Sequence, residues 1–438
     1  MLKFSVDARR RAADWILAVL FLAGAPLLAH GLYSWMGFNP TDDGFTLAYS
    51  RRILDGQIPH LDFITIRPFL SPVLHMPEAA WAGDHMLMAS RLVVWVQFAC
   101  IAWIWARMIN RMHGRPLGSP ACFAAAVICL AFSANTWPIM AWHTVDGLFL
   151  ATLGLAICTG ERARLKAAGY ALIASAYLCK QSFLFNGRPG AMPHTIFWVV
   201  AGAALYFAVD GRNSGPGRLA GRISLLALLL AFCVSVSVGA ANPSLMGGPL
   251  FLILLVNSLE VVGMPAVRTA LVLALAGFVA FGFNRSRHGS VYMEQPAARL
   301  TCKLDGVFHG ARGVRTNPNT FAFLEDLQKA VALARQDPWP HAIVPDVPGY
   351  WASSVQRNPL PIDWAKNTEL NTVALLSRVQ DSLDLQRGRL TVIVQKVEAF
   401  PLRYGFTPLR DPEKFAVAHY VRTHAVKRGE TKYFELYR

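Results

Sequence analysis

The sequence contains few charged residues for its length. Asp, Glu, Lys and Arg make up 16% of its 438 residues, and 54% of the residues are hydrophobic. A soluble globular protein usually carries about 25% charged residues, so this shortage argues for a lipid bilayer, which a helix of roughly 20 apolar residues can cross. Nine apolar runs approach that length, at residues 15–38, 88–109, 119–136, 145–160, 167–185, 193–209, 223–241, 248–263 and 267–283.

The sequence also lacks several motifs that would define other classes of protein. Six of the seven cysteines lie in or beside apolar runs, and only Cys302 falls in the C-terminal region, which excludes a disulfide within that region. No CxxC pair or Cys/His cluster indicates a metal site. No GxxxxGK[ST] loop and no GxSxG elbow is present, which argues against a P-loop nucleotide site and an α/β-hydrolase nucleophile. An enzyme whose site faces the outside of the membrane lacks a supply of nucleotides, so its energy would have to come from a lipid-linked substrate.

The net charge of +15 follows the pattern of a membrane protein rather than that of a nucleic-acid-binding protein. With a cytoplasmic N-terminus, the inside segments before residue 284 hold fourteen Lys and Arg residues and the outside segments hold four. This positive-inside bias orients membrane helices, and nine crossings would place the C-terminus outside. Arg9 to Arg11 before the first run also allow a signal peptide, but eight further runs favour a retained anchor.

The apolar and polar regions predict two domains. Residues 1–283 form a transmembrane domain with a long first extracytoplasmic loop, 39–87, and residues 284–438 form a small extracytoplasmic α/β domain that holds 22 of the 42 basic residues. The predicted fold is therefore an α-helical polytopic membrane bundle of about nine helices followed by a soluble α/β domain.

Short patterns predict the elements outside the membrane. A short helix is expected over 42–54, with an apolar stripe from Phe45 to Ile53 lying on the membrane surface. Further helices are expected over 318–336 and 369–385, and strands at HAIVP (341–345), LTVIVQ (390–395), VAHYV (417–421) and YFELY (433–437).

The first loop concentrates the candidate catalytic groups. Six of the twelve acidic residues before residue 284 lie in it. Asp42 and Asp43 directly follow the first apolar run, at the bilayer surface, where a carboxylate with a raised pKa can act as a general base. The alternative is that both are solvated or cap the following helix.

Basic and polar groups at the same membrane depth complete the predicted site. Arginine forks bind phosphate well, and ionisable residues inside apolar runs are functional candidates, although each could also form a local ion pair or reach the interface. The expected donor-phosphate ligands are Arg51, Arg52, Arg67 and Lys180. The residues expected to line a shared cavity are Asp62, His143, Asp146 and Gln181.

The loop resembles a known family. TDDGFTLAYSRRILDGQIPHLDF followed by RPFLSP is similar to the first extracytoplasmic loop of the GT-C superfamily, which includes the protein O-mannosyltransferases and the lipid A aminoarabinose transferases. AWHTVDGLFLATLGL and YLCKQSF resemble later helices of bacterial members. The resemblance implies that Asp42 matches the catalytic acidic residue of the family and Asp43 its acidic neighbour. The nine predicted spans fall short of the eleven to thirteen that GT-C proteins often have.

The residues and the resemblance together predict an inverting glycosyltransferase. Its donor would be a polyprenyl-phosphate sugar and its acceptor an envelope glycan, lipid or protein, at the outer face of a bacterial inner membrane; no nucleic acid is expected, and a divalent metal is an open option. Two alternatives remain at this point. One is a transporter or flippase of a lipid-linked sugar, although the sequence shows none of the internal repeats typical of transporters. The other is a non-catalytic scaffold with this architecture.

Overall fold

The chain divides into two compact units in a computed structural model, which describes residues 12–111, 116–135, 137–160, 163–180, 215–237, 243–411 and 413–438. Unit 1 comprises Met1–Tyr33 and Leu92–Gly289, and unit 2 comprises Ser34–Arg91 and Ser290–Arg438. The predicted boundary at residue 283 separated the first loop from the C-terminal region, whereas the structure joins them. The physical reason is that the loop buries its apolar side chains in the C-terminal core.

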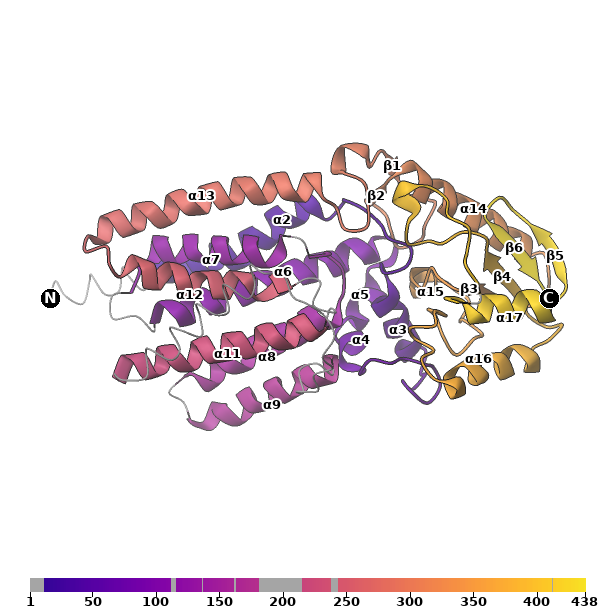
Figure 1. Ribbon diagram of the computed structural model, residues 1–438, viewed down its shortest axis with the longest axis horizontal. Coiled ribbons are helices and arrows are strands. Elements are labelled where there is room, and N and C mark those ends of the chain that lie inside the picture. The colour runs from indigo at the N-terminus through magenta and orange to yellow at the C-terminus, as the bar shows by residue number, and fades with distance from the viewer. Residues whose placement is uncertain are drawn as a thin grey trace. The chain divides into compact units, whose positions relative to one another are not determined.

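Unit 1 is helical. Its first helix, Ala12–Tyr33, contains the π-helical segment η1 (Leu20–Gly24) and ends as α2 (Ala25–Tyr33). The later helices, which Figure 1 labels, are α6 (Met86–Arg111, which begins in unit 2), α7 (Ser119–Ala134), α8 (His143–Cys158), α9 (Ala163–Cys179), α11 (Gly215–Ser237), α12 (Gly247–Leu259) and α13 (Pro265–Gly289). The short η5 (Pro243–Met246) precedes α12.

The prediction of about nine membrane-spanning helices is wrong for the part of the chain that the structure describes. Three helices there are long and apolar enough to cross a membrane: Ala12–Tyr33, Gly83–Arg111 and Pro265–Gly289. Four other apolar helices are shorter, and α7, with 16 residues, extends only about 24 Å at 1.5 Å per residue, less than the ~30 Å of hydrocarbon. The run 248–263, for example, continues four residues past Leu259, where α12 ends and a turn begins. The run 193–209 lies outside the described residues.

Small residues and aromatic contacts pack the helices of unit 1. A Cβ added to Gly154 in α8 would lie 2.5 Å from the carbonyl oxygen of Gly169 in α9, so only glycine allows this approach. Phe132 of α7 stacks on Phe251 of α12 with ring centroids 4.4 Å apart. These contacts are local to each helix pair, which Figure 1 shows running side by side.

Unit 2 contains a four-stranded mixed sheet. Its order is β3 (His341–Val344), β4 (Thr391–Gln395), β6 (Phe434–Tyr437) and β5 (Lys427–Glu430), with β3 and β4 parallel and the other pairs antiparallel. A smaller sheet pairs β1 (Cys302–Lys303) with β2 (Arg315–Thr316). The helices are α3 (Phe45–Leu54), α4 (Leu70–Leu74), α5 (Met76–Trp81), α14 (Pro318–Ala334), α15 (Gly349–Ser353), α16 (Val373–Leu385) and α17 (Ala416–His424), with short 3-10 turns at η2 (Gly83–His85), η6 (Ala297–Arg299) and η7 (Leu402–Tyr404).

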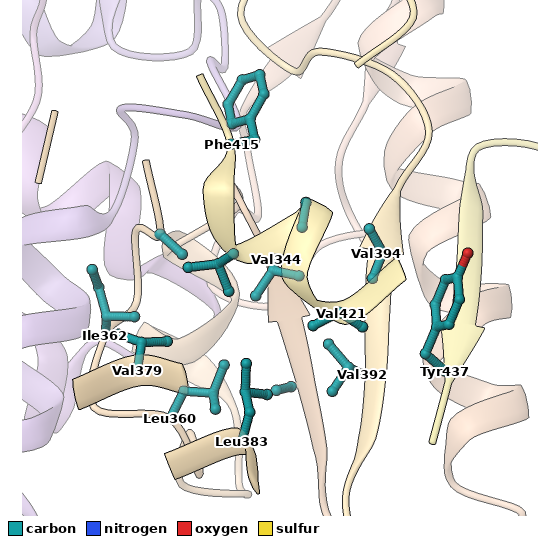
Figure 2. Close-up of a cluster of buried hydrophobic side chains, with 14 of the residues drawn as sticks. Val344, Leu360, Ile362, Val379, Leu383, Val392, Val394, Phe415, Val421 and Tyr437 are labelled. Carbon is teal, nitrogen blue, oxygen red and sulfur yellow. The ribbon is translucent and has the colours of Figure 1, made fainter. Parts of the chain in front are cut away.

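The main core of unit 2 lies between one face of the sheet and two helices. Val392 and Val394 of β4 project toward Val379 of α16 and Val421 of α17, as Figure 2 shows. Strand side chains alternate between faces, so the intervening Ile393 belongs to the other face, where Phe323 of α14 packs on Phe434 with centroids 4.9 Å apart. The strands predicted at 341–345, 390–395 and 433–437 are therefore confirmed as β3, β4 and β6.

Two local predictions for unit 2 are wrong. VAHYV forms α17, because Val417, Ala418 and Val421 lie on one helical face and are all buried. The stripe from Phe45 does not lie on a membrane surface. Phe45 is fully buried against Trp364, at a centroid distance of 5.2 Å.

Candidate active site around Asp42

Asp42 and Asp43 lie in a turn that Asn39 organises. The side-chain oxygen of Asn39 accepts hydrogen bonds from the backbone N–H groups of Thr41, at 2.9 Å, and Asp42, at 3.1 Å, as asparagine often does in turns. The Asp43 carboxylate closes the turn by accepting from the N–H of Asn39 at 2.8 Å. Helix α3 starts after Gly44, which is its N-cap residue, so neither carboxylate occupies the cap position.

Asp43 is held by a buried arginine. Arg91 lies 3.1 Å from the second carboxylate oxygen of Asp43, and its guanidinium also donates to the carbonyl oxygens of Ser34 and Gly37, at 2.6 and 2.8 Å. Each oxygen of Asp43 therefore has a partner within the protein. Because breaking a buried ion pair strands a charge, we assign Asp43 a role in positioning the turn.

Asp42 has a different environment. Its side chain is 5% exposed, and one oxygen accepts a hydrogen bond from the hydroxyl of Tyr292 at 2.9 Å. Burial raises the pKa of Asp42 from 3.8 to about 6, against the lowering effects of the Lys366 charge and the Tyr292 hydrogen bond. Burial and the neighbouring Asp42 charge raise the pKa of Tyr292 above its ordinary value of 10, so the phenol remains a donor at neutral pH.

Lys366 and Asp346 form the polar surroundings of Asp42. Asp346 follows β3, at the carboxyl end of the parallel strand pair, which is where α/β folds place ligands. Its carboxylate lies 3.3 Å from the ammonium of Lys366 and accepts from the indole N–H of Trp364 at 2.9 Å. Burial raises the pKa of Asp346, and the Lys366 charge opposes that rise.

Two glycines bring the turn and the strand end together. Gly44 has φ +87°, and a Cβ there would lie 2.7 Å from the Cα of Gly349, the first residue of α15. A Cβ on Gly349 would lie 2.6 Å from the carbonyl oxygen of Asp43. Val347, between Asp346 and α15, also has a positive φ of 75°, which is costly for a β-branched residue. The backbone is thus constrained on both sides of the site.

The three arginines of the first loop have different partners in the structure. Arg52 is 4% exposed and binds both oxygens of Asp363, at 2.6 and 2.8 Å, so it connects α3 to the C-terminal region. Arg51 is more exposed and pairs with Asp55 at 3.2 Å. Arg67 alone adjoins the Asp42 environment: its guanidinium lies 5.4 Å from the ring centre of Trp364.

Arg67 is also paired, while Asp62 lies in a turn. Arg67 contacts Glu369 at 2.7 Å. Asp62 was predicted to line a cavity, but its carboxylate accepts from the backbone N–H of Ile58 at 2.6 Å in an exposed turn. Of the predicted loop residues, the structure therefore groups Asp42, Asp43 and Arg67 around the strand end.

The remaining predicted residues belong to unit 1. His143 and Asp146 are buried in the first turn of α8, and Asp146 accepts from the side-chain amide of Gln97 at 2.7 Å. Lys180 directly follows α9, and its backbone N–H donates to Ala176. Gln181 lies outside the described residues.

The described residues hold no group of three or more His, Cys, Asp and Glu side chains arranged to bind a metal ion. Around Asp42 the acidic groups are instead interleaved with the cation of Lys366 and the phenol of Tyr292. This set of side chains fits a proton-transfer site better than a divalent-cation site, because a divalent cation prefers oxygen ligands without a competing cation.

Tyr292, Asp346 and Lys366 are the site residues that sequence reasoning missed. Asp346 had a usable signal, because it follows the predicted buried strand HAIVP. Tyr292 and Lys366 had none, since their proximity to Asp42 depends on contacts between segments more than 200 residues apart in the chain. Comparison with known proteins adds no identification: no protein-family model, curated protein or solved structure matches the chain.

Proposed function

We propose that this protein transfers a sugar from a polyprenyl-phosphate donor to a lipid, glycan or protein acceptor, with Asp42 as the general base. The observation that supports this role is a buried carboxylate with a pKa of about 6. At pH 7 such a group is about nine-tenths ionised, yet it is basic enough to take a proton during a reaction near neutral pH. The GT-C resemblance of the loop assigns the same residue.

The transfer step is a displacement with inversion. Asp42 takes the proton of an acceptor hydroxyl or amine, and the freed electron pair attacks the anomeric carbon. The bond from that carbon to the phosphate oxygen breaks, and the lipid phosphate leaves with its electron pair. Tyr292 donates to the Asp42 carboxylate and so orients the oxygen that receives the proton.

Cations must stabilise the departing phosphate, where negative charge develops. Lys366 is the best-placed cation on electrostatic grounds, since its charge already acts on Asp42, and Arg67 shares contact with the same Trp364 ring. Arg52 is unsuited to the role that the sequence suggested, because Asp363 and a backbone carbonyl occupy its guanidinium.

The helices that can span a membrane support an extracytoplasmic site. Residues 34–82 and 290–438 are separated by two such helices, Gly83–Arg111 and Pro265–Gly289, and both segments belong to unit 2. With the basic residues before the first helix inside, unit 2 lies outside. This arrangement supports a site at the periplasmic face of a bacterial inner membrane, and it does not require nine spans.

The test is turnover of labelled donors by the full chain. Purified wild type and the variant Asp42→Asn would be incubated in detergent with a panel of radiolabelled polyprenyl-phosphate sugars, with and without EDTA. We expect the wild type to release lipid phosphate from one donor and Asp42→Asn to lose at least a hundredfold in rate, since positioned acid–base groups contribute about that much.

The matched control is Asp62→Asn, which makes the same chemical change in an exposed turn of the same loop and should retain activity. Full complementation of a deletion strain by Asp42→Asn, with no turnover of any donor by the wild type, would overturn the transferase. That result would leave the scaffold or the transporter. Loss of turnover in EDTA would add a divalent cation to the mechanism.

A further inference from the structure

A second candidate site lies within unit 1, among residues that the proposed transfer reaction does not use. It is a cavity of about 430 Å³ between the first helix, α6 and the end of α8, within the usual size range of small-ligand sites. Its lining includes Asp14, Trp15, Trp103, Arg107, Arg111 and Thr159.

The charge of this cavity favours an anion. Arg107 and Arg111 supply two positive charges, and Asp14 supplies one negative charge. The Asp14–Arg107 contact is long, at 3.9 Å, and both side chains are about one-third exposed, so the pair neutralises the arginine only weakly. Asp14 also accepts a hydrogen bond from the hydroxyl of Ser119 at the start of α7. The guanidinium of Arg107 therefore retains donors for a phosphate.

Aromatic rings fix the wall of the cavity. The guanidinium of Arg107 lies 6.0 Å from the ring centre of Trp103, which is within cation–π range. Trp103 in turn stacks on Phe21 of the first helix at 5.4 Å. The arginine is thereby held against the helix pair, which reduces the entropy lost when it binds a ligand.

The position along the helices indicates a membrane interface. Asp14 and Trp15 lie in the first turn of one helix long enough to span a membrane, and Arg107 and Arg111 lie in the last turns of another. Tryptophan and arginine are enriched at this level of membrane proteins. Beyond Trp15, the first helix exposes Ile16, Val19 and Leu20, which are 59%, 61% and 56% exposed.

We infer that this cavity binds an anionic phospholipid. Its phosphate lies between Arg107 and Arg111, its headgroup fills the cavity beside Trp15, and an acyl chain follows the exposed apolar face of the first helix. Basic pockets between membrane helices commonly bind acidic lipids. The residues all belong to unit 1, so this lipid is distinct from the glycosyl donor assigned to the Asp42 site.

Native mass spectrometry of the full chain in detergent tests the inference. The protein would be titrated with phosphatidylglycerol, with phosphatidylcholine of the same acyl chains, and with glycerol 3-phosphate. We expect half-saturation by phosphatidylglycerol at a concentration at least tenfold lower than by phosphatidylcholine. The variant Arg107→Gln/Arg111→Gln should raise the phosphatidylglycerol value about tenfold, or ~1.4 kcal/mol.

Arg164→Gln is the matched control. Arg164 is an exposed arginine near the start of α9 in the same unit and does not line the cavity. Its removal should therefore change the half-saturation concentration of phosphatidylglycerol by less than twofold. Because Arg107 contacts Asp14, the double variant risks misfolding, and the single variants Arg111→Gln and Trp15→Ala, both at exposed positions, provide a second route. Equal half-saturation concentrations for the two phospholipids would overturn the inference. So would an equal rise in the phosphatidylglycerol value in Arg164→Gln and Arg111→Gln. Binding of glycerol 3-phosphate as tight as that of the lipid would replace it with a soluble-phosphate site.

Discussion

Asp42 should destabilise the folded protein at neutral pH while serving the proposed transfer reaction. Its folded-state pKa of about 6 lies above the ordinary value of 3.8, so the fold binds the protonated acid more tightly than the carboxylate. The stability contributed by this group is fully present below pH 3.8 and is lost as the pH rises through 6. At about 1.36 kcal/mol per pH unit, the loss amounts to about 3 kcal/mol.

The variant Asp42→Asn isolates this effect. Asparagine resembles the protonated acid, and its side-chain oxygen can still accept a hydrogen bond from the Tyr292 hydroxyl. At pH 8 the variant should therefore be more stable than the wild type by up to about 3 kcal/mol. At pH 5 the wild type regains about half of this stability through protonation, so the advantage of the variant should fall by about half.

Thermal unfolding in detergent at pH 5, 6.5 and 8 measures this difference, since each kcal/mol shifts the midpoint by a few degrees in a chain of this size. Carboxylates that do not interact with Asp42 titrate equally in the two proteins and cancel in the comparison. A variant less stable than wild type by the same amount at pH 5 and pH 8 would refute the assignment of a raised pKa. It would show instead that the Asp42 carboxylate is a stabilising structural group.

Three further predictions concern Lys366 and Gly349 near Asp42 and the structural Arg52–Asp363 ion pair. Removing the cation in Lys366→Gln should raise the pKa of Asp42 above 6, so the acid limb of the pH–rate profile should move to higher pH; an unmoved limb would exclude electrostatic coupling between the two residues. Gly349→Ala places a Cβ 2.6 Å from the Asp43 carbonyl oxygen and should cost about 1–3 kcal/mol, seen as a lower unfolding midpoint. Gly429→Ala is the control, because an added Cβ there meets no atom within 4 Å and neither glycine has a positive φ. Arg52→Gln strands the buried Asp363 carboxylate and should cost about 3–5 kcal/mol, and unchanged stability would contradict its assignment as a structural group.

The sequence predicted the elements of unit 2 where one pattern was strong. HAIVP and LTVIVQ became β3 and β4 because continuous apolar runs of this length are typical of buried strands. VAHYV was misassigned, since five residues fit both periods and burial of Val417 and Val421 on one helical face decided for α17. The membrane prediction failed for a related reason: hydropathy measures the apolar length of a run, and the length of the helix inside it depends on where turns begin.

The candidate site could be predicted only where its residues are close in sequence. Asp42 and Asp43 were found because they are adjacent and follow an apolar run. Their partners depend on tertiary contacts: Tyr292 reaches Asp42 across 250 positions. Arg52 and Arg67 were assigned to phosphate because their counter-ions, Asp363 and Glu369, lie some 300 residues away. Arg51 instead pairs with Asp55 in the same loop. The local sequence therefore gives the charge of a side chain but does not identify a distant residue that neutralises it.

The structure also explains why the two adjacent aspartates should not be equivalent. Asp43 accepts from the Asn39 N–H with one oxygen and from Arg91 with the other, so both lone-pair sets are committed to the turn. Asp42 receives one neutral hydrogen bond, from Tyr292, and its pKa is raised. A general base needs a lone pair for the incoming proton and a pKa near the working pH, and Asp42 meets both conditions. Asp43→Asn should therefore lower stability and activity together, by leaving Arg91 without its carboxylate, whereas Asp42→Asn should lower activity and raise stability.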